Sequence, residues 1–258
     1  MYDFTYHRPS SLDDAAVAIK GAGDGTFLAG GQTLLPILKL RLANPSDVVD
    51  LGSIAELKGI TVDGDTVTIG AMTPHAEVAG SADVCAKIPA LADLAESIGD
   101  LQVRNRGTIG GSIANNDPAA DYPAAVVGLG ATVHTNARTI AADDFFTGLL
   151  ETALNDGEII TAVSFPVPDK AAYQKFGNPA SRYAIVGVML SSGSAGVRVA
   201  ITGAGPCVFR QGNMEKALAG SFSADAVAGV TVSADGLNSD IHASAKYRAH
   251  LVGVMAKR

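Results

Sequence analysis

The sequence predicts an α+β fold of mixed strands and helices, in which two lobes are followed by a C-terminal domain. Three observations predict it. Strand-like and helix-like segments alternate over residues 10–53, a hairpin signal with further strands and helices follows over 54–167, and strands followed by helices fill 168–258. Alternation of strands and helices favours parallel pairing, whereas consecutive strands favour antiparallel sheets.

The first lobe, about residues 1–53, has the pattern of two strands joined by a helical crossover. A hydroxyl cap followed by two acids indicates a preceding helix over residues 10–20. Thr26–Ala29 and Asp47–Leu51 have the composition of short strands. Thr33–Leu42 is apolar at nearly every position and has Pro36 in its first turn, so we expect a buried helix between two parallel strands.

The second lobe, about residues 54–167, begins with a hairpin. Asp63-Gly64-Asp65 separates two strand-like runs, Gly59–Val62 and Thr66–Gly70. Ile88–Ile98 has apolar residues at helical spacing and predicts a helix. The other predicted elements are a helix beginning at Pro74–Val78, a helix at Pro123–Gly128, and strands at Ala131–Thr135 and Glu158–Phe165.

A domain boundary is expected at Pro166-Val167-Pro168-Asp169, because two prolines interrupt the strand pattern there. The chain then divides into residues 1–167 and 168–258. The C-terminal part predicts an antiparallel sheet with helices. Its expected strands are Ala184–Leu190, Gly196–Thr202 and Ala172–Phe176, and its expected helices are Gly212–Ala219, Ala224–Val230 and Ile241–Met255.

Composition excludes several classes of protein. The net charge is −7 with few clustered basic residues, which argues against nucleic-acid binding. No apolar run approaches the roughly 20 residues of a membrane span, and the N-terminus lacks the basic and apolar regions of a signal peptide. The two cysteines, Cys85 and Cys207, suggest a reducing compartment and cannot ligate a four-cysteine cluster. We therefore expect a cytoplasmic protein.

Two Gly-Gly pairs carry the strongest functional signal. Gly30-Gly31 lies in residues 26–36 and Gly110-Gly111 lies in residues 108–123, each where an apolar run gives way to the start of a helix. Backbone without Cβ atoms can approach a ligand closely, and a helix start offers N–H groups to an anion. Two such loops could bind the two phosphates of one dinucleotide. The alternative is a pair of ordinary strand-to-helix turns capped by threonine.

The chain resembles the FAD-binding medium subunit of the molybdenum hydroxylases, and within it the carbon monoxide dehydrogenase medium-chain group. The residues that carry the resemblance are Phe4 and Tyr6, 29–36, 108–123 with the string Thr-Ile-Gly-Gly-Ser…Asp-Pro-Ala-Ala-Asp, and 175–188. The resemblance implies a two-lobed FAD-binding domain of the vanillyl-alcohol-oxidase type, followed by a carbon monoxide dehydrogenase flavoprotein-like domain. It also implies noncovalent FAD that passes electrons from a [2Fe–2S] subunit to an external acceptor.

The resemblance implies roles for individual residues. It assigns the diphosphate and nearby ribityl chain to two stretches, which are Ala29, Gly30, Gly31, Gln32 and Thr33, and Thr108, Ile109, Gly110, Gly111 and Ser112. It assigns Asp121 to the ribityl chain, Ile160 to the adenine, Tyr183 to stacking on the isoalloxazine and Lys175 to the reduced flavin. Asp117 either braces the loop or touches the flavin. Each has a structural alternative: a helix cap for Asp121, strand core for Ile160 and a strand edge for Tyr183 and Lys175.

Partners follow from the same resemblance. An iron–sulfur small subunit and a molybdenum-cofactor large subunit would complete the enzyme, with two heterotrimers in a dimer. The residues show no catalytic acid–base pair, and the five histidines have no metal-ligand spacing. Two alternatives stay open: a stand-alone flavin oxidoreductase of this fold, and a non-catalytic nucleotide-binding scaffold. The hydroxylase substrate (carbon monoxide, an aldehyde or an N-heterocycle) and the acceptor (quinone, NAD or O₂) are also open.

Overall fold

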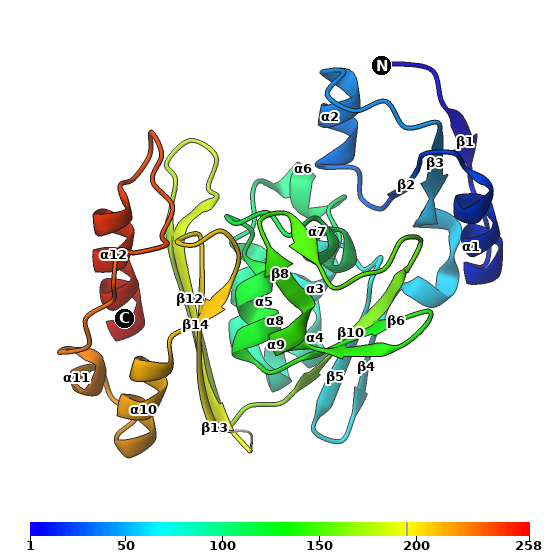
Figure 1. The fold of residues 1–258 in the computed structure, drawn as a ribbon. Helices are drawn as coiled ribbons and strands as arrows, with labels where there is room; N and C mark the ends of the chain where they lie inside the picture. The colour runs from blue at the N-terminus through cyan, green and yellow to red at the C-terminus, as the bar shows by residue number, and fades with distance from the viewer. Residues whose placement is uncertain (195) are drawn as a thin grey trace.

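The computed structural model describes residues 1–194 and 196–258, and Figure 1 shows two lobes and a third layer of sheet and helices. The first lobe holds a parallel sheet in the order β1-β3-β2. Its strands are β1 (Thr5–His7), β2 (Gly25–Leu28) and β3 (Asp47–Asp50). Helix α1 (Leu12–Gly21) begins where the Ser11 side chain accepts a hydrogen bond from the N–H of Asp14, as its sequence predicts.

Helix α2 differs from the expectation for Thr33–Leu42. The helix spans only Leu34–Lys39, and Leu38 is its single buried residue. Leu40 is 70% exposed and Leu42 is 73% exposed, so the prediction that the helix is buried was wrong. The predicted crossover is confirmed, because β2 and β3 on either side of α2 pair in parallel. The helix stands at the outer end of the first lobe (Figure 1). The apolar composition of residues 33–42 therefore did not correspond to burial of this segment.

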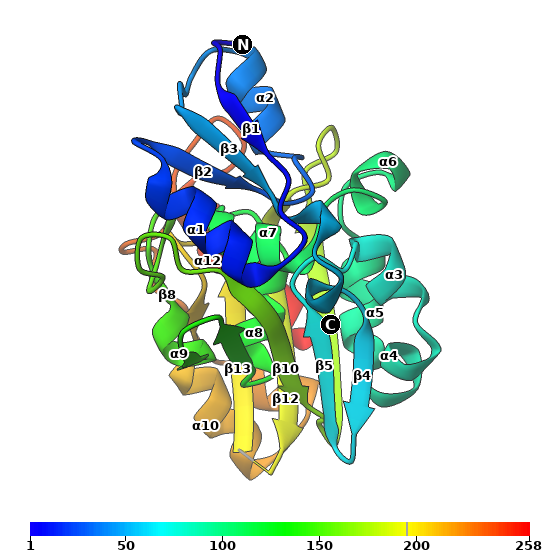
Figure 2. The same cartoon turned by 90° about the vertical axis from the view of Figure 1, so that its right-hand side faces the viewer.

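The second lobe is built on an antiparallel sheet in the order β4-β5-β10-β6-β7. The predicted hairpin is confirmed, because β4 and β5 pair with Asp63 opposite Thr66. The first lobe stands over one end of this sheet in both views (Figures 1 and 2). The strands are β4 (Ile60–Asp63), β5 (Thr66–Gly70), β6 (Thr132–Thr135), β7 (Thr139–Ala141) and β10 (Ile160–Pro166), with a separate two-stranded β8 (Phe146–Gly148) and β9 (Glu151–Thr152).

Helices fill the space between this sheet and the C-terminal sheet (Figure 1). Helices α5 and α8 supply many of the fully buried residues of the largest core, among them Leu91, Leu94 and Tyr122. Both helices also contact strands of the C-terminal sheet. The helices of this lobe are α3 (His75–Gly80), α4 (Ala82–Lys87), α5 (Pro89–Glu96), α6 (Leu101–Arg104), α7 (Ile109–Asn115), α8 (Tyr122–Gly128) and α9 (Ala142–Phe145), and the short η1 (Leu51–Ser53) and η2 (Ala55–Leu57) precede them.

The C-terminal layer is an antiparallel sheet, as the sequence predicts. Its strand order is β11-β12-β13-β14, and the short β14 was not predicted. Its outer face carries three helices over a second core. The last helix does not begin near Ile241, because Ser244 caps it and Asp240 holds the preceding turn by accepting two backbone N–H bonds. The elements are β11 (Lys170–Gly177), β12 (Ala184–Gly193), β13 (Gly196–Thr202), β14 (Phe209–Arg210), α10 (Gly212–Gly220), α11 (Ala224–Val227) and α12 (Ala245–Lys257).

Candidate functional site

A cavity of about 690 Å³ lies where the two lobes meet the C-terminal layer. The first lobe contributes residues 26–37 in part, and the second lobe contributes both α7 and the segment before β10. The C-terminal layer contributes the loop 180–183 between β11 and β12. The volume lies in the range typical of small-molecule and cofactor sites.

The first glycine pair forms a turn between β2 and α2. Gly31 has φ +76°, a conformation that favours glycine. In the part of the chain that the structure describes, we find no hydrogen-bond acceptor for the backbone N–H groups of Gly31, Gln32 and Thr33. All three residues line the cavity. This turn therefore offers free donors to an anionic ligand.

The second glycine pair lies in the first turn of α7 and not in an open loop. Thr108 caps the helix by accepting the N–H of Gly111 at 3.1 Å. The N–H of Ile109 is donated to the carbonyl of Thr73, and that of Gly110 to the carbonyl of Ala71. The expected free N–H donors are thus already used by the protein in this turn. What it offers the cavity is a surface without large side chains, together with the Ser112 side chain.

The two glycine turns contact each other. A Cβ built on Gly30 would lie 2.0 Å from the carbonyl oxygen of Arg106, and one on Gly111 would lie 3.1 Å from the Cβ of Ala29. A Cβ on Gly110 would lie 2.6 Å from that of Ala71. Gly30 is therefore required for the close approach of the two lobes, and Gly110 for packing within the second lobe, independently of any ligand.

A buried charge cluster lies beside the cavity. The Asp121 Oδ1 atom accepts the Tyr173 hydroxyl at 2.5 Å and lies 3.0 Å from the Lys175 ammonium. Burial raises the pKa of Asp121, an effect that the Lys175 ammonium and the Tyr173 hydroxyl oppose. The Oδ2 atom accepts no hydrogen bond from residues 1–194 or 196–258, and Asp121 lines the cavity. This oxygen is available to a hydroxyl group of a ligand.

Lys175 itself does not line the cavity. Besides pairing with Asp121, its ammonium donates to the carbonyl of Ser97 at 2.8 Å. Tyr183 is 54% exposed at the cavity, and burial and then the nearby Asp117 and Asp121 raise its pKa. The cavity gathers all the residues predicted for the site except Lys175 and Ile109, which is fully buried in the core.

Several lining residues escaped sequence analysis. His75 is buried, and its Nδ1 atom has no partner among the described residues. Burial, and to a smaller extent Arg104, lowers the pKa of His75 to about 4, so the ring is neutral at pH 7. Phe27, Met72 and Glu158 also line the cavity. A lone histidine or glutamate gave no signal, because most of the residues around it in the cavity are distant in the sequence.

The described residues contain no group of three or more His, Cys, Asp or Glu side chains arranged to hold a metal ion. Within the same residues, we find no helix that is both long and apolar enough to cross a membrane.

Residues 2–168 match a family model described as the FAD binding domain in molybdopterin dehydrogenase. The chain belongs to the family of FAD-binding medium subunits of molybdenum hydroxylases. The carbon monoxide dehydrogenase medium chain of Hydrogenophaga pseudoflava is 36% identical, over 99% of this chain and 95% of the relative. The nicotine 6-hydroxylase medium subunit of Paenarthrobacter nicotinovorans is also 36% identical, over 98% of this chain and 94% of the relative.

Solved structures agree with this family. Carbon monoxide dehydrogenase from Hydrogenophaga pseudoflava superimposes with a TM-score of 0.87 at 35% identity, over 99% of this chain and 95% of that chain. Quinoline 2-oxidoreductase from Pseudomonas putida 86 gives a TM-score of 0.89 at 30% identity, over 99% and 95%. As a member of this family the chain is an oxidoreductase subunit that binds FAD. The cavity fits such a ligand, with free N–H donors at one turn and a carboxylate oxygen for hydroxyl groups.

Proposed function

We propose that the cavity binds one noncovalent FAD per chain, with its diphosphate against the two glycine turns. The observation that carries this proposal is the set of N–H groups without an acceptor among the described residues at Gly31, Gln32 and Thr33. These three residues line the same cavity as the small residues of α7. Backbone donors in such a turn favour an anion without adding a full positive charge. Ala29, Gly30, Thr108, Gly111 and Ser112 complete the surface around the diphosphate, and Ile109 and Gly110 support it from the core.

The remaining predicted residues divide between the two ends of the ligand. Asp121 accepts hydrogen bonds from ribityl hydroxyl groups through its free oxygen, and Asp117 braces the loop beside it by accepting the N–H of Ala119 at 2.8 Å. Tyr183 stacks on the isoalloxazine ring, and Lys175 acts on the flavin through Asp121. Ile160 contributes to the adenine end. These roles correspond to two domains, 1–167 for FAD binding and 168–258 as the layer that covers the flavin.

In the assembled enzyme, FAD supplies the electron-carrying chemistry between a [2Fe–2S] subunit and an external acceptor. The chain's own contribution is to bind, orient and tune this cofactor. Its two cysteines cannot hold a cluster, so the iron–sulfur and molybdenum groups belong to a small and a large partner subunit. Two relatives are named as the medium chain of a carbon monoxide dehydrogenase and the medium subunit of a nicotine 6-hydroxylase. We further propose a dimer of heterotrimers located in the cytoplasm.

Co-expression with candidate small and large subunits tests this function. We expect a stable complex that carries flavin absorption bands and reduces an external acceptor with the hydroxylase substrate, whereas the isolated chain binds flavin without turning over an organic substrate. A purified chain without flavin bands would support a non-catalytic scaffold. Rapid turnover of an organic substrate by the isolated chain would support a stand-alone oxidoreductase instead.

A further inference from the structure

One wall of the cavity is a short segment that leads into β10. Leu154, Glu158, Ile159 and Ile160 all face the cavity from this segment, as do Phe27 and Leu51 from the first lobe. Apart from Glu158 these side chains are apolar. An apolar wall of this kind suits a flat aromatic ring better than a phosphate or a sugar.

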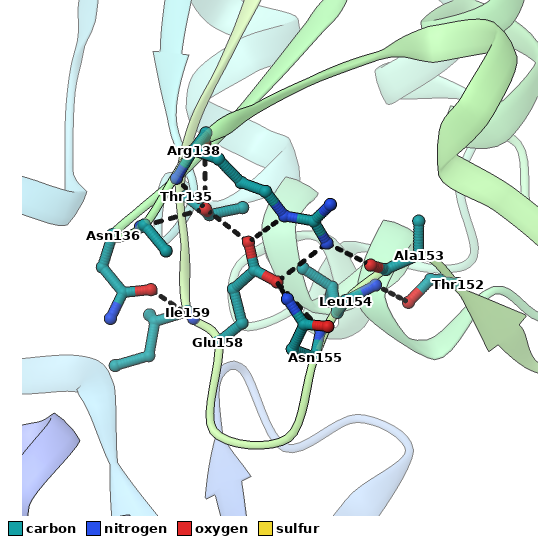
Figure 3. Close-up of polar contacts among 10 residues, drawn as sticks. Thr135, Asn136, Arg138, Thr152, Ala153, Leu154, Asn155, Glu158 and Ile159 are labelled. Atoms are coloured by element: carbon teal, nitrogen blue, oxygen red, sulfur yellow. Dashed lines mark hydrogen bonds and ion pairs between the residues drawn. The ribbon is translucent and has the colours of Figure 1, made fainter.

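The carboxylate of Glu158 is surrounded by donors (Figure 3). Its Oε1 atom accepts the Thr135 hydroxyl at 2.7 Å and Nε of Arg138 at 3.0 Å. Its Oε2 atom accepts Nη2 of Arg138 at 3.1 Å, and the backbone N–H and side-chain amide of Asn155 at 2.8 and 2.9 Å. These donors, with Arg138 the largest effect, lower the pKa of Glu158 to about 2. The carboxylate is therefore charged and fully occupied by the protein.

The same cluster holds the backbone on both sides of Glu158. Nη2 of Arg138 also donates to the carbonyl of Ala153 at 2.5 Å. Asn136, which precedes Arg138 on the neighbouring turn, exchanges two bonds with Ile159: its side-chain oxygen accepts the Ile159 N–H at 3.0 Å, and its own N–H donates to the Ile159 carbonyl at 2.9 Å. The segment is thus fixed to the turn that follows β6 (Figure 3).

The segment also joins the two lobes. Ile159 is buried in the core of the first lobe, with Val49 and Leu51. A Cβ on Gly157 would lie 3.3 Å from a methyl group of Ile19 in α1. The position of this segment therefore sets how closely the first lobe approaches β10 at this end of the cavity.

We propose that Glu158, held by Arg138, is a positioning residue that fixes the wall for the adenine ring and so determines preference for an adenine dinucleotide. Both carboxylate oxygens of Glu158 already accept hydrogen bonds from protein donors, so this carboxylate does not need a hydrogen bond from the ligand. The proposal rests on the proposed function, because it takes the ligand of the cavity to be FAD. The carboxylates Asp117 and Asp121 and the ring of Tyr183 line other parts of the same cavity and suit the ribityl chain and flavin.

The test uses two half-ligands, ADP and FMN, with the 258-residue chain freed of flavin. Glu158→Gln replaces the carboxylate by a neutral amide, so the ion pair with Arg138 is lost and the segment is less firmly fixed. We expect FAD and ADP to bind about tenfold more weakly, while the dissociation constant of FMN changes by less than about twofold. Glu215→Gln is the matched control. Glu215 also accepts an arginine, Arg210, and a backbone N–H, that of Val199, but it does not line this cavity.

Thr135→Val provides a second variant. It removes the hydroxyl that donates to Glu158 and accepts the N–H groups of Ala137 and Arg138, and it keeps the ion pair between Arg138 and Glu158. We expect Thr135→Val to raise the dissociation constant of ADP about threefold and to leave that of FMN unchanged. This variant replaces Glu158→Gln in the test if Glu158→Gln does not fold. Equal weakening of ADP and FMN, or unchanged ADP binding in a folded variant, would overturn the proposal. The wild-type chain distinguishes a failure of the proposed function from a failure of this inference. If the wild-type chain binds no FAD, the proposed function fails. If it binds FAD while the variants keep the wild-type ratio of ADP to FMN affinity, only the inference about Glu158 fails.

Discussion

The two Gly-Gly pairs look alike in the sequence but have different tasks in the structure. The pair Gly30-Gly31 forms an open turn whose following N–H groups have no acceptor among the described residues. The pair Gly110-Gly111 lies in a helix whose first N–H groups are donated to Thr73, Ala71 and Thr108. The first turn is therefore built to donate to a ligand, and the second to let the backbone pack closely.

The largest expected effect concerns the first glycine of each pair. Gly30→Ala and Gly110→Ala each place a methyl group against backbone or core atoms, 2.0 Å from Arg106 and 2.6 Å from Ala71. We expect each to lower the free energy of unfolding by about 3 kcal/mol, measured by urea denaturation. Gly253→Ala in α12 is the control, because its Cβ would meet no atom of the described residues within 4 Å, and it should stabilise by about 0.5–1 kcal/mol. Wild-type stability in both test variants would show that neither glycine is needed for packing.

The second glycine of each pair tests the ligand. Gly31→Val forces a β-branched residue into a conformation with φ +76° and redirects the free N–H groups. FAD should bind about 100-fold more weakly, or about 2.7 kcal/mol, by calorimetric titration. Gly111→Ala intrudes more mildly, 3.0 Å from the Thr108 hydroxyl, and should cost about tenfold. A greater loss of FAD affinity in Gly111→Ala than in Gly31→Val would show that the second turn, and not the first, contributes most to ligand binding.

Acid should weaken the second turn through His75. The backbone N–H of His75 donates to the carbonyl of Gly107, and burial lowers the pKa of its ring from 6.5 to about 4. Between these values the unfolded chain binds the proton and the folded chain does not, so stability is lost as the pH falls. The free energy of unfolding should decrease by about 2 kcal/mol from pH 7.5 to pH 5. His75→Gln should remove this decrease. An unchanged slope in the variant would exclude His75 as its source.

Much of the fold was predictable, because local signals and burial agreed. Ser11 caps α1 where the sequence places a hydroxyl before two acids, and the hairpin at residues 63–65 forms as expected. Prediction failed where tertiary position decides exposure. Leu40 and Leu42 were expected in a buried helix but are exposed at the outer end of the first lobe. Ile241 was expected in a helix but is 95% exposed and precedes Ser244, which caps the helix.

The candidate site was predictable only where a motif carried it. The two glycine pairs, Asp121 and Tyr183 were found from their strings, and the cavity gathers them. The pairing of Lys175 with Asp121 and that of Glu158 with Arg138 were not foreseen. Each joins residues 20 or more positions apart that meet only when β11 covers the second lobe or β6 pairs with β10. The spacing of these residues in the sequence therefore could not predict these contacts.

The smallest expected effect concerns the flavin end of the cavity. Tyr183→Ala removes an exposed ring rather than a bond to the diphosphate, so FAD affinity should change by less than about threefold while the flavin midpoint potential shifts. Lys175→Met should also shift the potential, by altering the charge of Asp121. Tyr247→Ala, a similarly exposed tyrosine outside the cavity, should change neither quantity. A large loss of affinity with an unchanged potential in both test variants would place the flavin elsewhere.

The central claim is that the two glycine turns together hold a diphosphate. Titration of the flavin-free wild-type chain with FAD and with FMN tests it most directly, because the two ligands share the flavin and differ in the second phosphate and the adenosine. We predict one FAD per chain, bound at least about tenfold more tightly than FMN, or about 1.4 kcal/mol. Equal affinities for the two flavins would contradict the account.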